Sequence, residues 1–183
     1  MSKLEFVPNP AEESEGMNHS GIAIFKGSAY AATARECGQN SADAHQSIPV
    51  EIKFDHTDIP SSELPDLDQY KKAVSLCLEN VRKLDDDKGI TFFSRAQKVL
   101  EQGRIHILTI SDFNTSGLRG PSKEGTPFHS LLKGSGSSVK DSDVAGGSFG
   151  IGKFAPFCIS ELQTVFYSTI YQDADGKNNF LAQ

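Results

Sequence analysis

The pattern of apolar and polar positions predicts alternating helices and strands. Residues 28–47 are rich in alanine and predict a helix, which Pro49 ends. Residues 50–56, VEIKFDH, alternate apolar and polar positions as a half-buried strand does. Residues 104–112, RIHILTISD, are rich in isoleucine and predict a second strand, which ends on an aspartate.

Between these two strands the sequence predicts a loop and two helices. Residues 57–65 predict the loop, and Asp66 with Gln69 has the character of a capping box at the start of a helix. The apolar positions of this helix form one stripe: Leu67, Tyr70, Val74, Cys77, Leu78, Val81 and Leu84. A shorter helix is expected over residues 93–102, ending at Gly103. The stripe can pack in the core or bind a partner, and core packing is the favoured interpretation.

The last third of the chain changes character. Residues 117–152 contain 9 of the 16 glycines together with many serines, which predicts a long loop of the kind that often forms a lid. The following residues predict a short helix from FGIGKFAPFCIS, a strand from LQTVFYSTIYQ and a hairpin turn from DADGKN. The chain stops within the returning strand, so we expect residue 183 to be a truncation point with further domains after it.

Composition sets the class of the protein. With 183 residues, 37% hydrophobic and 23% charged, the chain suits one ordinary α+β domain over residues 21–183, preceded by an arm over residues 1–20. No stretch approaches the length of a membrane span, and we expect a cytoplasmic protein. The net charge of −6 does not indicate nucleic-acid binding through a general basic field. Cys37, Cys77 and Cys158 lack the spacing of a zinc site and predict reduced thiols.

The first candidate constellation lies in the alanine-rich helix. Glu36, Asn40 and Asp43 are spaced i, i+4 and i+7, which places them on one helical face. This face is either solvated or faces a polar ligand, in which case the carboxamide oxygen suits Mg²⁺ and a carboxylate could activate water. Small residues occupy the other faces and predict close packing against a neighbour: Ala31, Ala34, Gly38 and Ala42.

Asp112 is the second candidate. It ends a strand and precedes the turn-like FNTSGLRG, so it is either a turn-forming residue or an enclosed carboxylate that accepts a hydrogen bond from an exocyclic amine such as that of adenine.

The third candidate is GGSFGIGKFAPF, residues 146–157. Its glycines precede a helix, so their amides could surround a phosphate, although glycines also mark plain flexible loops. The run from Gly147 to Lys153 fits the opening of a P-loop formally. Phe154 follows where Ser or Thr would hold Mg²⁺, and no apolar strand precedes the run, so the P-loop interpretation is rejected.

Taken together, these motifs resemble those of the GHKL ATPases, the superfamily of gyrase, the ninety-kilodalton heat-shock chaperone, the histidine kinases and the MutL proteins. The resemblance rests on the order ExxxN on a helix, a strand-end aspartate, and a glycine-rich lid that closes on GxxGxG. GSFGIGKFAPF is most similar to the chaperone branch. The resemblance covers residue 20 to the end and implies a two-layer sandwich, in which helices cover one face of a mixed β-sheet beside a Gly/Ser-rich lid.

The resemblance also implies residue roles. Glu36 would be the general base that orients the attacking water, and Asn40 the Mg²⁺ ligand. Asp43 would make a supporting polar contact near the nucleotide, Asp112 would receive the adenine amine, and Gly117 would let the base approach the backbone.

The phosphates of ATP would be held near the end of the lid, by the backbone amides of Gly147, Gly150, Ile151 and Gly152. Lys153 would either reach a phosphate or lie at the rim of the site. One departure concerns the adenine pocket: the family usually has DxGxG, whereas DFNTSG places Asn114 at the first glycine, so the pocket is expected to differ in shape.

The resemblance implies Mg²⁺-dependent ATP binding and slow hydrolysis, coupled to lid closure, homodimerisation and downstream domains. One alternative is a nucleotide-gated interaction module that binds ATP without significant hydrolysis. Another is a scaffold that binds no nucleotide and carries these motifs by coincidence.

Overall fold

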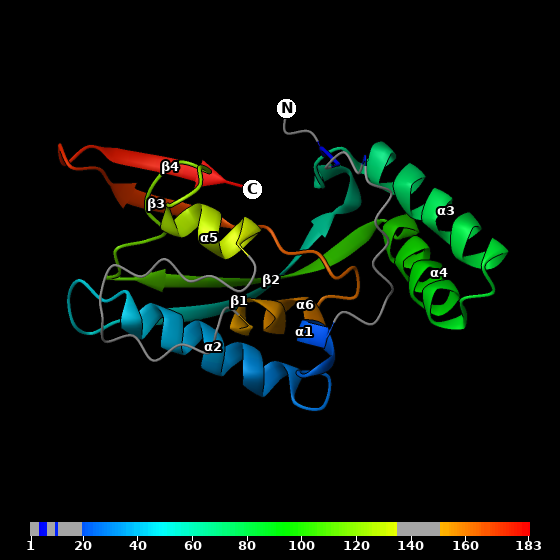
Figure 1. Cartoon of the computed structure of the whole chain (residues 1–183), viewed down its shortest axis with the longest axis horizontal. Helices are drawn as coiled ribbons and strands as arrows, with labels where there is room; N and C mark the ends of the chain where they lie inside the picture. The colour runs from blue at the N-terminus through cyan, green and yellow to red at the C-terminus, as the bar shows by residue number, and fades with distance from the viewer. Residues whose placement is uncertain (1–3, 7–9, 11–19, 135–150) are drawn as a thin grey trace. The chain divides into compact units, whose positions relative to one another are not determined.

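The computed structural model describes residues 4–6, 10, 20–134 and 151–183. Its helices and strands follow the chain in this order: α1 Ser20–Ala23, α2 Ala29–Asp43, β1 Glu51–Pro60, the 3₁₀ helix η1 Ser61–Glu63, α3 Leu67–Lys83, α4 Asp87–Glu101, β2 Arg104–Phe113, α5 Pro127–Lys133, the 3₁₀ helix η2 Gly152–Phe154, α6 Ala155–Ile159, β3 Ser168–Gln172 and β4 Asn178–Ala182 (Figure 1). The predicted mixture of helices and strands is confirmed, and the fold class is α+β.

The described strands form two antiparallel pairs, β1 with β2 and β3 with β4 (Figure 1). The β3–β4 pair is the predicted hairpin, in which Thr169 faces Leu181. The Asp173 side chain accepts hydrogen bonds from the backbone amides of Asp175 and Lys177 and closes the turn, and Gly176 takes a φ of 76° there. A single mixed sheet with helices on one face stays a prediction.

The chain divides into two compact units. The first, called the α3–α4 unit, comprises residues 55–109 with the described N-terminal residues 4–6 and 10. The second, called the α2 unit, comprises residues 21–54 and the described residues of 110–183. The division falls within both β1 and β2 along the sequence.

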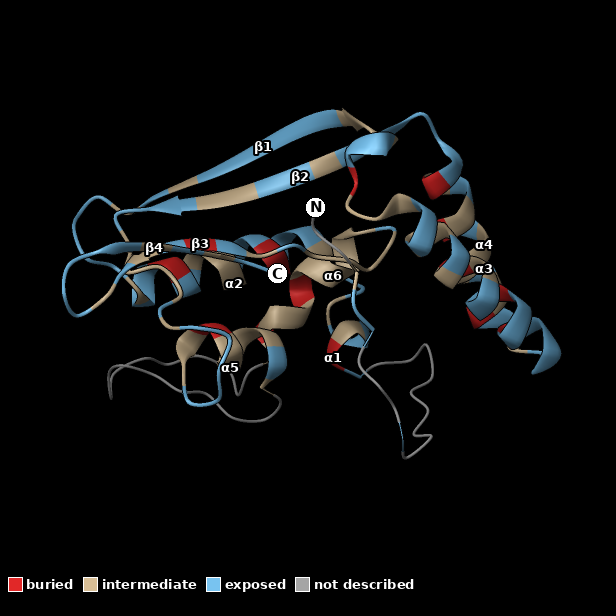
Figure 2. Ribbon diagram, turned by 90° about the horizontal axis from the view of Figure 1, so that it is seen from above, coloured by how far each residue is buried: buried red, intermediate tan, exposed pale blue. Residues whose placement is uncertain are grey.

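The core of the α3–α4 unit forms where α3 packs on α4. Red segments on both helices mark buried residues in Figure 2. These residues recur at helical spacing and include Val74, Leu78 and Val81 on α3, and Ala96 and Leu100 on α4. Core packing of the predicted stripe is therefore confirmed at its centre. Cys77 and Leu84, which the stripe also contained, are exposed, because a helix in contact with one neighbour buries a narrower face than the full stripe.

Three local predictions in this unit need correction. The predicted loop over residues 57–65 is wrong at its start, since β1 continues to Pro60. The predicted capping box is also wrong: Asp66 accepts from the Leu4 amide and Gln69 donates to the Leu4 carbonyl, so both side chains bind the N-terminal segment instead. Helix α4 begins at residue 87, earlier than predicted, because the Asp86 side chain accepts from the amides of the first helical turn.

In the α2 unit, helix α2 packs against η2 and α6. The residues that α2 buries are Ala32, Thr33 and Ser41. The two hydroxyl groups donate to the backbone carbonyls of Ala29 and Cys37 at 2.8 and 2.9 Å, so burial leaves no polar group unsatisfied.

The predicted small-residue contact face of α2 is wrong. Ala31, Ala34 and Ala42 are exposed, and among the described residues no atom lies within 4 Å of a Cβ built at Gly38. The sequence pattern failed because satisfied hydroxyl groups, which it treats as polar, face the neighbour. No helix in the described part of the chain has the length and apolar character needed to cross a bilayer.

Candidate functional site

Glu36 and Gly152 are brought together by the packing of α2 on η2. A Cβ placed on Gly152 would lie 2.0 Å from Glu36 Oε2 and 2.9 Å from its carboxyl carbon, so the Glu36 side chain would have to move. Gly152 is buried. The glycine therefore lets the predicted general base lie directly against the backbone of residue 152.

Asp112 and Glu36 both influence the pKa of the Cys37 thiol. Burial raises the pKa of Cys37, and the negative charges of Asp112 and then of Glu36 raise it further. Burial also raises the pKa of Tyr167 to about 12, with a second contribution from Cys37. Residues from α2, from the end of β2 and from the segment before β3 therefore lie within electrostatic reach of one another in the α2 unit.

Gly117 lies against β3. Its φ of 64° is in the left-handed region, and an added Cβ would lie 2.5 Å from the Ile170 carbonyl oxygen and 2.8 Å from Thr169 Oγ1. Thr169 is buried, and its hydroxyl oxygen accepts from the Leu118 amide at 2.9 Å. Thr169 was not among the predicted site residues, because its strand also contains Ser168 and Gln172 and nothing in the sequence distinguishes it.

The loop after β2 is hydrogen-bonded to the segment that follows α2. Asn114 has a φ of 65°, a conformation that asparagine tolerates better than most residues with a side chain. Its Nδ2 donates to the Pro49 carbonyl at 2.7 Å, while its own carbonyl accepts from the amides of Gln46 and Ser47 at 2.8 and 3.2 Å. Asn114 therefore adopts the left-handed backbone that glycine would take there, and adds a tether that glycine lacks.

The other two predicted site residues of α2 are exposed to solvent. Asn40 and Asp43 are exposed, and Asp43 Oδ1 accepts from the Gln39 amide nitrogen at 2.7 Å. Asn40 lies one helical turn after Glu36, and its carboxamide oxygen is a hard ligand of the kind that Mg²⁺ prefers. Asp112 is exposed as well, so the expectation of an enclosed carboxylate is wrong: the strand-end position by itself does not bury the side chain.

Lys153 is the central residue of η2 and is partly buried. Its Nζ donates to the Gly134 carbonyl and lies 5.5 Å from the centroid of the Phe154 ring. Burial lowers the pKa of the ammonium group. Of the two roles expected for Lys153, these contacts favour a place at the rim, where it binds the backbone that enters the lid segment.

The structure places six of the predicted site residues in the α2 unit with contacts or charges that connect them to the rest of the unit: Glu36, Asp43, Asp112, Gly117, Gly152 and Lys153. Ile151 directly precedes η2 and is half-buried. Gly147 and Gly150 lie outside the described residues, as does the rest of 135–150. The predicted long loop over residues 117–152 is wrong in its described part, where Pro127–Lys133 forms α5 with Thr126 as its N-cap.

Searches of protein-family models, of curated proteins and of solved structures each returned no match to this chain.

Proposed function

We propose that the chain binds ATP with Mg²⁺ and hydrolyses it slowly, as a GHKL-type domain with a two-layer sandwich and a Gly/Ser-rich lid. The observation that carries this proposal is the approach of Glu36 to Gly152. These two residues come from motifs at opposite ends of the chain, and each has a role in the proposed chemistry. A side chain at residue 152 would displace Glu36 from this contact, and a glycine is expected where a backbone must approach a phosphate.

The proposed nucleotide contacts divide between two parts of the α2 unit. Asp112 accepts a hydrogen bond from the adenine amine, and Gly117 lets the base approach the backbone. The amides of Ile151 and Gly152, with those of Gly147 and Gly150, hold the phosphates. The close packing of Gly117 on β3 supports this division, since it fixes the loop after β2 without a bulky side chain.

In the proposed reaction, Glu36 accepts a proton from the attacking water. The water oxygen bonds to the γ-phosphorus, the bond from that phosphorus to the bridging oxygen breaks, and ADP leaves with the electron pair. Mg²⁺ held by Asn40 would neutralise phosphate charge. The exposed position of Asn40 leaves room for metal and water.

Calorimetric titration with a non-hydrolysable ATP analogue, with and without Mg²⁺, tests binding. We expect Mg²⁺-dependent binding in the wild-type chain and its loss in Asp112→Asn and Asn40→Ala. Asp68→Asn, an exposed carboxylate of α3 outside the α2 unit, is the matched control and should bind normally. Equal binding in all four proteins would overturn the assignment of the site.

Phosphate release tests hydrolysis separately. Glu36→Ala should lower turnover by roughly 10² to 10⁴ while leaving analogue binding intact. Unchanged turnover would remove Glu36 from the mechanism. Light scattering with the analogue tests the proposed homodimer, and a dimer that forms with ATP while phosphate release is absent would favour the nucleotide-gated interaction module instead.

A further inference from the structure

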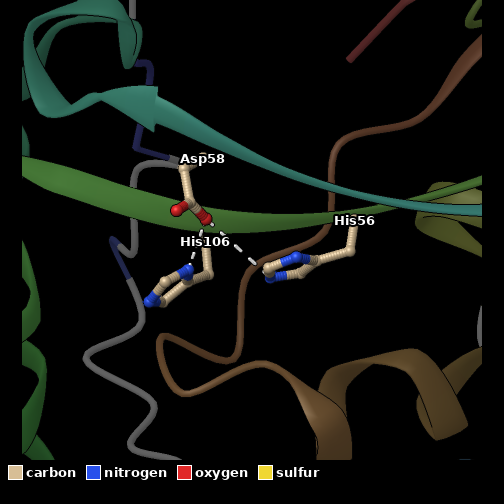
Figure 3. A group of neighbouring side chains, drawn as sticks. All are labelled: His56, Asp58 and His106. Carbon is tan, nitrogen blue, oxygen red and sulfur yellow. Dashed lines mark hydrogen bonds and ion pairs between the residues drawn. The ribbon is translucent and has the colours of Figure 1, made fainter.

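Three side chains with metal-ligating groups gather on the β1–β2 ladder, within the α3–α4 unit. His56 and Asp58 are two residues apart on β1, so their side chains point to the same face of the strand. His106 lies on β2, which pairs with β1. Figure 3 shows the two imidazole rings turned toward the Asp58 carboxylate from neighbouring strands.

The distances within this cluster are those of groups that can share one ion. Asp58 Oδ1 lies 2.5 Å from His106 Nδ1 and 3.9 Å from His56 Nε2, and one ligand atom from each of the three residues lies within 4.8 Å of the others. Two ligand atoms on a tetrahedral zinc ion are separated by about 3.3 Å, given bond lengths of about 2.0–2.2 Å. The observed separations bracket that value.

The side chains are free to make the remaining adjustment. All three residues are exposed, so small changes in side-chain torsion angles require no repacking of a core. The two rings are already stacked, with centroids 5.4 Å apart and an interplanar angle of 23°. The Arg104 guanidinium donates to the backbone carbonyl of Asp58, which leaves the carboxylate available to an ion.

The donor set selects the class of metal. Two imidazole nitrogens and one carboxylate oxygen suit Zn²⁺ and its neighbours among the divalent transition metals, whereas Mg²⁺ and Ca²⁺ prefer oxygen ligands throughout. Three protein ligands leave at least one coordination position to water. A simple Asp–His hydrogen bond would account for Asp58 and His106, but it would not require the second histidine on the same face.

We propose that His56, Asp58 and His106 bind one divalent transition-metal ion of the Zn²⁺ class, with water in the remaining coordination position. The ion joins β1 to β2. It is separate from the Mg²⁺ proposed for ATP, since its ligands belong to the α3–α4 unit and Asn40 belongs to the α2 unit.

Calorimetric titration of the untagged chain with Zn²⁺ tests the proposal, and Co²⁺ absorption reports the ligand type. We expect one ion per chain and no displacement by excess Mg²⁺. His56→Ala, Asp58→Asn and His106→Ala should each weaken binding at least about 10-fold, the lower end of the effect of losing even a group that orients a ligand. His45→Ala, an exposed histidine elsewhere, and Cys77→Ser, an exposed thiol, should bind as the wild type does.

Thermal unfolding gives a second readout. Zn²⁺ should raise the unfolding temperature of the wild-type chain and not that of Asp58→Asn, because only an ion bound to the native state stabilises it. Circular dichroism establishes that each variant is folded, and the near-isosteric Asp58→Asn keeps the test decisive if a histidine variant unfolds. Absence of Zn²⁺ binding to the wild-type chain overturns the proposal, and so does an affinity in all three variants equal to that of the wild type. A thiolate-to-cobalt absorption band that Cys77→Ser removes also overturns it.

Discussion

The packing inside one unit of the molecule differs from the packing inside the other. In the α3–α4 unit, aliphatic side chains at helical spacing face each other across two helices, and Leu100 is completely buried. Close glycine contacts occur in both units, and Gly89 of α4 lies against Val81 of α3. In the α2 unit, three glycines instead meet an aromatic ring, a carboxylate and a backbone carbonyl. Gly21 lies against the Phe154 ring, Gly152 against Glu36, and Gly117 against the β3 backbone.

The two kinds of packing place polar groups differently. A helix pair packed through aliphatic side chains excludes polar groups from its contact, so it provides stability and little else. Packing through glycines brings backbone amides and carbonyls close to charged side chains, as at Glu36 and Gly152. The residues proposed to bind ATP belong to the second kind of packing.

The largest expected effect tests the aliphatic core. Leu100→Ala should lower the free energy of unfolding by about 2–5 kcal/mol, because it removes a buried side chain and leaves a cavity. Leu76→Ala, at a side chain that is 55% exposed on α3, should change it by less than about 0.5 kcal/mol. Chemical denaturation measures both values. Equal effects would mean that the aliphatic contact does not hold the unit together.

The next effect concerns the α2 unit at high pH. Because the pKa of Tyr167 is raised from 10.0 to about 12, its stabilising contribution is complete below pH 10 and is lost as the pH rises through 12. The free energy of unfolding should therefore fall by about 2–3 kcal/mol over that interval. Denaturation at a series of pH values should show this fall in the wild type and in Tyr30→Phe, an exposed tyrosine, and lose it in Tyr167→Phe.

Substitutions in the α2 unit distinguish a glycine in tight contact from a glycine with open space around it. Gly117→Ala should destabilise the protein by about 1–3 kcal/mol, because alanine is strained at a φ of 64° and its Cβ meets the Ile170 carbonyl. Gly38→Ala should instead stabilise it by about 0.5–1 kcal/mol, since alanine is the better helix former and no described atom lies near its Cβ. Thermal or chemical unfolding gives both signs. Two effects of the same sign would contradict this distinction.

The smallest effect reports on the electrostatics around Cys37. Asp112→Asn and Glu36→Gln should each increase the rate at which Cys37 is alkylated several-fold, because removing a negative charge lowers the raised pKa of the thiol. Peptide mapping by mass spectrometry measures this rate at Cys37 separately from the exposed Cys77. Glu101→Gln, an exposed carboxylate of α4, is the control. Rates unaffected by Asp112 and Glu36 would show that these carboxylates do not converge on the thiol.

The sequence by itself determined the type and approximate position of α2, β1, α3, α4, β2 and the β3–β4 hairpin, but not of α1 or α5. Alanine content predicted α2, isoleucine content predicted β2, and the helical spacing of Val74, Leu78 and Val81 predicted the buried face of α3. These features follow from local propensity and from the periodicity of apolar side chains, which act over a few residues and can be recognised in a linear sequence.

Tertiary structure alone decided which residues meet. Leu4 takes the hydrogen bonds that Asp66 and Gln69 were expected to exchange in a capping box. The buried face of α2 consists of Ala32 and two satisfied hydroxyl residues, not of the small residues that the pattern predicted. The approach of Glu36 to Gly152 and the gathering of His56, Asp58 and His106 likewise depend on chain crossings between distant segments. No local pattern encodes such contacts, because they arise only when strands pair and helices pack.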